Sequence, residues 1–60
     1  MEHKVVAIRA TGVMPDAVAA EMEHALNEAG KEGWTLRTVQ PVIYNSATTG
    51  YFLLVLERPA

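Results

Sequence analysis

Apolar residues are concentrated in three short stretches of the chain, and in a fourth they recur at every third or fourth position. The three short stretches are His3–Ala10, Trp34–Ile43 and Tyr51–Arg58, and their β-branched and aromatic residues predict strands. Between the first two stretches, one apolar stripe predicts a helix over Pro15–Glu32. The stripe consists of Val18, Met22, Ala25, Leu26 and Ala29. The pattern therefore predicts a single β-α-β-β domain over residues 1–60.

The predicted helix has recognisable ends. Pro15 suits the first turn, where its missing N–H costs nothing, and Gly33 suits a left-handed stop after Lys31. Gly30 lies inside the helix, where glycine costs about 1 kcal/mol relative to alanine. We expect a close approach of the helix end to the sheet at Gly30, and a helix that ends at this residue is the alternative.

The last strand determines the expected order of the sheet. Its two alternating sets are Phe52, Leu54 and Leu56 on one face and Tyr51, Leu53 and Val55 on the other. A strand that is apolar on both faces belongs in the centre of a sheet. A turn-forming cluster, Asn45–Gly50, joins this strand to the second one as a hairpin. We therefore predict the α+β class, with a three-stranded antiparallel sheet in the order 1-3-2 and one helix on one face.

One helix leaves the second face of this sheet uncovered. The residues expected there are Val5, Ala7, Val39, Tyr51, Leu53 and Val55. Such an apolar surface invites a partner or aggregation, and a chain of this length buries only about 60% of its unfolded surface by itself. We predict a homo-oligomer, with a dimer favoured, joined through this face. Edge-to-edge pairing of the outer strands is the alternative.

The composition disfavours several classes of function. Without cysteine the chain has no disulfide and no thiolate metal site, which fits a cytoplasmic location. The net charge of −2 and the scattered positions of the five cations disfavour nucleic-acid binding. The longest apolar run, Tyr51–Leu56, is far shorter than the ~20 residues that span a membrane, and the N-terminus has no signal-peptide pattern. We expect neither a nucleic acid nor a membrane as a partner.

A resemblance to a known family covers nearly the whole chain. The motifs that carry it are Lys4-Val5-Val6, Leu26-Asn27, Gly30-Lys31-Glu32-Gly33-Trp34-Thr35-Leu36, an apolar strand and Arg58-Pro59. Their order resembles domain-of-unknown-function family 4177, whose short bacterial proteins typically read Leu-Asn, Gly-x-x-Gly-Trp-Glu-Leu and Arg-Pro. Thr35 stands where a glutamate is common. The resemblance implies a strand–helix–strand–strand fold and no known site.

Two histidines are the candidates for metal or acid–base chemistry. His24 shares a helix face with Glu21 and Glu28, at spacings of three and four, and such a set could recruit a stray divalent ion. An exposed polar face with a weak histidine–glutamate contact explains the same spacing, so we expect no metal site. His3 lies near a frayed terminus and is expected to face solvent.

Three aromatic residues form a second group of candidates. Trp34 is expected to fill the core between helix and sheet instead of stacking on a ligand. Tyr44 and Tyr51 bracket the hairpin loop. Their bodies are expected to be half buried in an exposed hairpin, and a polar ligand between the hydroxyl groups is the alternative.

Two arginines are candidates for an anion site. Alternation along the strands places Arg37 and Arg58 on opposite faces of the sheet, so the two guanidinium groups are not expected to meet. Surface ion pairs of these arginines with Glu57 or Glu32 are the simpler expectation.

These observations favour a non-enzymatic, self-associating interaction module of unknown cellular role, with room for an unidentified protein partner. The alternative is a small-molecule binding protein with a pocket at the subunit interface, near Tyr44, Tyr51 and Trp34. An enzyme with a shared active site is the weakest interpretation, because the chain offers no nucleophile–base pair. We expect no catalytic residue, no cofactor and no metal.

Overall fold

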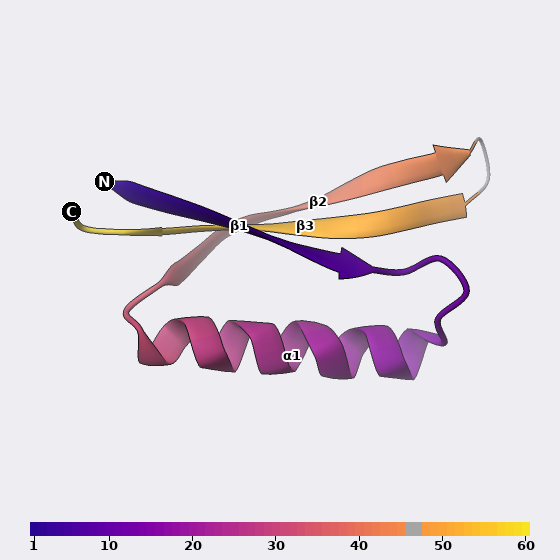
Figure 1. Ribbon diagram of the computed structural model, residues 1–60, viewed down its shortest axis with the longest axis horizontal. Helices are drawn as coiled ribbons and strands as arrows, with labels where there is room; N and C mark the ends of the chain where they lie inside the picture. The colour runs from indigo at the N-terminus through magenta and orange to yellow at the C-terminus, as the bar shows by residue number, and fades with distance from the viewer. Residues whose placement is uncertain (46–47) are drawn as a thin grey trace.

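A computed structural model describes residues 1–45 and 48–60 and contains one helix and three strands within them (Figure 1). In chain order these are β1 (Glu2–Arg9), α1 (Pro15–Lys31), β2 (Thr35–Asn45) and β3 (Thr48–Arg58). The predicted β-α-β-β order is confirmed. The hairpin strands are longer than the sequence pattern predicts, because part of the turn-forming cluster joins the ladder and Asn45 pairs with Thr48.

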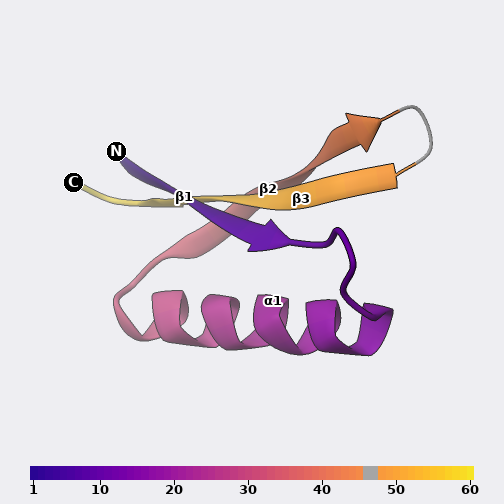
Figure 2. The same cartoon turned by 45° about the vertical axis from the view of Figure 1, so that its right-hand side comes forward.

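The three strands form one antiparallel sheet in the order β1-β3-β2, as predicted. Helix α1 lies along one face of this sheet in both Figure 1 and Figure 2, and no other element covers the opposite face within the described residues. Strand β3, whose two faces are both apolar, is therefore central, and β1 and β2 are the two edges. The predicted layer arrangement is confirmed.

The core between helix and sheet is small. Its buried residues are Ile8, Val18, Ala29, Leu54 and Leu56, and the half-buried side chains packed around them include Val6, Met22, Leu26, Trp34, Val39 and Phe52. The molecule is long and thin, with Cα extents of 38 × 20 × 11 Å. Its radius of gyration of 12.2 Å exceeds the value of about 10 Å expected for a compact chain of this length. So elongated a chain buries little apolar surface by itself.

A β-bulge in β2 overturns one sequence-based assignment. Leu36 pairs with Leu56 and Thr38 pairs with Val55, so Arg37 is an extra residue without a partner in the ladder. The extra residue reverses the alternation beyond it, and Val39 pairs with the buried Leu54 and packs against the core. The prediction that Val39 lies on the uncovered face was therefore wrong.

The ends of α1 follow the sequence signals closely. Met14 is the N-cap residue with an extended backbone, and no side chain caps the first turn. At the other end Gly33 has a φ of 87°, in the left-handed region that favours glycine. The expected close approach at Gly30 is wrong, because a Cβ built at this position meets nothing within 4 Å.

The two glycines near the helix end therefore give a matched pair of substitutions. Gly30→Ala should raise the free energy of unfolding by up to about 1 kcal/mol, because alanine favours a helix interior and has room here. Gly33→Ala should lower it by about 1–2 kcal/mol, because the positive φ strains a residue with a Cβ. Urea denaturation at fixed protein concentration measures both changes, and a stabilising Gly33→Ala would contradict this description of the helix stop.

Candidate functional site

The face of the sheet opposite α1 is the largest candidate surface. Partners across an antiparallel ladder point to the same side. The β1–β3 pairs on this side are Val5–Val55, Ala7–Leu53 and Arg9–Tyr51. The β2–β3 pairs on this side are Thr38–Val55, Gln40–Leu53 and Val42–Tyr51. We call the surface formed by Val5, Ala7, Val42, Tyr51, Leu53 and Val55 the open face.

The open face is accessible to solvent in the isolated chain. Val5 is 59% exposed and Tyr51 is 46% exposed, while Leu53 and Val55 are half-buried by their neighbours. Five of the six residues predicted to form the interface lie together here; Val39 does not. Val42 was missed because the bulge that removes Val39 from this face brings Val42 onto it.

Polar side chains surround the apolar centre of the open face. His3 and Glu57 lie at one end, with 3.9 Å between His3 Nε2 and a Glu57 carboxylate oxygen, and Arg9 lies at the other end. Thr38 and Gln40 line the β2 side. An apolar centre with a polar rim is the usual anatomy of a protein interface. His3 is exposed, as expected, and nothing places it in a cavity.

On the helix side, Trp34 and Arg58 form a compact cluster near both chain ends. The guanidinium carbon of Arg58 lies 4.2 Å from the centre of the Trp34 ring. Arg58 Nε donates a hydrogen bond to the Glu2 carboxylate (2.8 Å), and Nη1 donates one to the Glu32 backbone carbonyl (2.7 Å). Trp34 packs against the core as predicted and is half-buried. This cluster ties the first strand, the helix end and the last strand together.

Arg58 has one contact that the sequence suggested and two that it did not. A contact with residue 32 was expected, although through the carboxylate and not through the backbone carbonyl. The stacking on Trp34 and the bond to Glu2 were missed. The bond to Glu2 follows from the β1–β3 register, in which Glu2 is directly opposite Arg58, so the predicted strand order already contained the signal.

The three aromatic candidates do not form one pocket within a subunit. Trp34 lies beside Arg58 at one end of β3, whereas Tyr51 lies on the open face towards the other end. The side chain of Tyr44 lies outside the described part of the structure. An apolar groove of about 420 Å³ occurs elsewhere, between the first half of α1 and β3, and is lined mainly by Val13, Val18, Met22 and Phe52.

The histidine and two glutamates of α1 lie on its exposed surface. His24, Glu21 and Glu28 are all solvent-accessible, and among the described residues no three His, Asp or Glu side chains are grouped closely enough to hold a metal ion. Glu28 instead lies 3.4 Å from the ammonium group of Lys31. That this surface binds no metal remains a prediction.

Comparison with known protein families yields a match over nearly the whole chain. The family described as "Domain of unknown function (DUF4177)" matches residues 2–59. No curated protein and no solved structure matches the chain significantly. Within the described residues, no helix is long and apolar enough to cross a membrane.

The Trp34–Arg58 cluster predicts a specific sensitivity to Arg58→Lys. This substitution keeps the charge but removes the planar group that stacks on the ring and bonds to Glu2 and Glu32. We expect a loss of about 1 kcal/mol in the free energy of unfolding, since the cluster is partly exposed. Arg37→Lys, at the exposed bulge residue, is the matched control and should change stability by less than about 0.5 kcal/mol. Equal effects of the two substitutions in thermal denaturation would contradict a stabilising role for the cluster.

Proposed function

The chain belongs to the DUF4177 family, which has no assigned function, and we propose that it is a non-enzymatic interaction module that associates with itself through the open face. The observation that carries this proposal is the apolar second face of β3. Leu53, Val55 and Tyr51 belong to the central strand, and no element of the described chain lies over them. In the proposed dimer, two open faces stack and the two helices lie on the outside.

The area of the open face is sufficient for a specific contact. Strands of 8, 11 and 11 residues, at about 3.3 Å per residue and 4.8 Å between strands, give each face of the sheet roughly 500 Å². Two fully overlapping copies would therefore bury at most about 1,000 Å² in total, which is at the lower end of specific interfaces. An elongated subunit with a small core gains stability from this burial.

A second copy suits this face because the face is apolar and uncharged at its centre. A two-fold axis that lies between two stacked sheets, parallel to their planes, would place apolar side chains of one copy against those of the other. The polar groups of His3, Glu57 and Arg9 would stay at the ends of the face, where they remain hydrated. A two-fold dimer therefore buries the apolar centre without burying a charge.

Tyr51→Asp tests the open face most cleanly. Tyr51 is partly exposed in the subunit, so the substitution changes the isolated fold little, but it would bury two carboxylates in the stacked dimer. We expect the dissociation constant of this contact to rise at least about a hundredfold, and the mass from light scattering to fall by half. Leu53→Asp should act in the same direction and also weaken the fold.

Met14→Asp is the matched control for this experiment. Met14 is a large apolar residue that is 74% exposed on the helix layer, away from the open face. Aspartate at this N-cap position should stabilise the helix by about 1 kcal/mol and leave the mass unchanged. An unchanged mass in both Tyr51→Asp and Leu53→Asp would rule out the open face as the interface.

A further inference from the structure

The two free edges of the sheet differ in how well they are protected against pairing. Strand β2 contains Pro41, which has no N–H to donate, and its register with β3 is broken near Arg37 and again after Val42. Strand β1 contains no proline, and its register with β3 is continuous from Glu2–Arg58 to Arg9–Tyr51. Of the two edges, β1 is the one that can accept another strand.

The backbone groups that β1 offers can be identified. Ala10 N–H donates to the Gly50 carbonyl (2.9 Å), so this residue belongs to a hydrogen-bonded pair with β3. Hydrogen-bonded pairs alternate along an antiparallel ladder. The backbone N–H and C=O groups of the even-numbered residues of β1 therefore point towards β3. The N–H and C=O groups of His3, Val5, Ala7 and Arg9 therefore point away from the sheet.

A strand added to this edge would also find space on the helix side. Two depressions lie along the boundary between β1 and α1. In Figure 1 the β1 edge of the sheet is turned towards the viewer. One, of about 640 Å³, has Lys4, Val6, Ala25 and Ala29 among its lining residues. The other, of about 400 Å³, is lined by Ile8, Ala20, Glu21, His24 and Ala25.

We propose that β1 pairs with β1 of a second copy, antiparallel, with Val6 on the two-fold axis. An axis normal to the sheet keeps helix-side residues beside helix-side residues, so Lys4 of one copy lies beside Ile8 of the other. Val5 then lies opposite Ala7, and His3 lies opposite Arg9. The outward backbone groups of these four residues form about eight hydrogen bonds across the axis, and the sheet continues through six strands.

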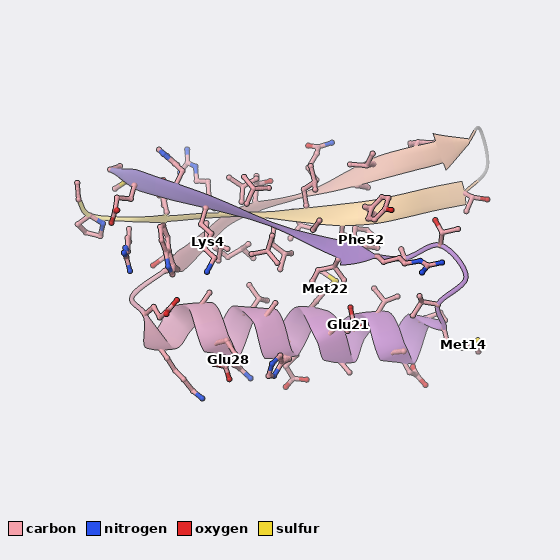
Figure 3. All side chains as sticks on the ribbon, in the orientation of Figure 1. Lys4, Met14, Glu21, Met22, Glu28 and Phe52 are labelled. Carbon is pink, nitrogen blue, oxygen red and sulfur yellow. The ribbon has the colours of Figure 1, made fainter. Side chains whose placement is uncertain are left out.

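Attraction between opposite charges favours this register over its neighbours. Ile8 and Glu21 line the same depression, so the ammonium group of Lys4 from the second copy reaches the Glu21 carboxylate, twice in the symmetric dimer. Figure 3 shows Lys4 directed from β1 towards the helix layer that carries Glu21 and Glu28. Within its own chain the Lys4 ammonium group lies 3.8 Å from a Glu32 carboxylate oxygen and 5.8 Å from the centre of the Trp34 ring. Both contacts are long and the ion pair is exposed, so they are easily exchanged.

The neighbouring registers are less favourable. With Val5 on the axis, Glu2 of the second copy takes the place beside Ile8 and faces Glu21, which puts two like charges together. With Ala7 on the axis, the ladder is shorter and Lys4 lies beyond the depression. The edge contact uses none of the area of the open face, so the two contacts are independent, and together they give a tetramer with perpendicular two-fold axes.

Backbone hydrogen exchange in the purified protein tests the edge contact separately from the open face. Pairing should slow exchange of the N–H groups of His3, Val5, Ala7 and Arg9 by about a hundredfold or more at millimolar concentration, and dilution should remove the protection. Stacking of open faces alone leaves these groups unbonded. Rapid exchange of all four N–H groups at millimolar concentration overturns the proposal. This result is expected if the β1 edge pairs only with a different protein.

A charge exchange tests the register. Lys4→Glu should raise the dissociation constant of the edge contact about tenfold or more, and Glu21→Lys in the same chain should restore it. Light scattering on both variants in the Tyr51→Asp background, where the open face no longer associates, isolates this contact. If that background does not fold, exchange at Val5 and Ala7 in otherwise unaltered chains gives the same comparison. An edge contact that Lys4→Glu leaves unchanged, or that Glu21→Lys does not restore, overturns the proposed pairing.

Discussion

The structure depends on one constraint: β3 is apolar on both faces, and the chain provides only one helix to cover it. The helix-side residues Leu54 and Leu56 are almost completely buried and form the centre of the core. Leu53 and Val55, on the other side, remain half-buried in the single subunit. Burial of apolar surface is the main stabilising term in folding, so the uncovered side of β3 supports the proposal that association between molecules supplies part of this stabilisation.

Hydrogen bonds and one stacking contact stabilise the two ends of the β1–β3 ladder that borders the small core. Near the hairpin, the Gly50 carbonyl accepts hydrogen bonds from the backbone of Ala10 and Thr11 and from the Thr11 hydroxyl group, which fixes the end of β1 before the helix. At the opposite end, Arg58 stacks on Trp34 and bonds to Glu2. Both sets of contacts join β1 to β3, so this edge strand keeps a regular geometry along its length.

The arrangement of elements could be predicted from the sequence because β3 alone requires the central position. The prediction failed locally at Val39, because no glycine or proline marks the bulge at Arg37, and one inserted residue reverses every side chain beyond it. Five residues of the open face were identified, since β1 and β3 pair without interruption. The Trp34–Arg58 stacking was missed, because it depends on where the helix end meets the last strand, which periodicity does not specify.

In the proposed assembly, a second copy of the chain covers the open face. Nuclear Overhauser effects between ¹³C-labelled and unlabelled chains, mixed in equal amounts, measure this contact directly. We predict cross-peaks between the methyl groups of Leu53 and Val55 in one copy and the Tyr51 ring or Val5 methyl groups in the other. Intermolecular cross-peaks that involve only helix-side residues such as Val6, or none at millimolar concentration, would contradict the account.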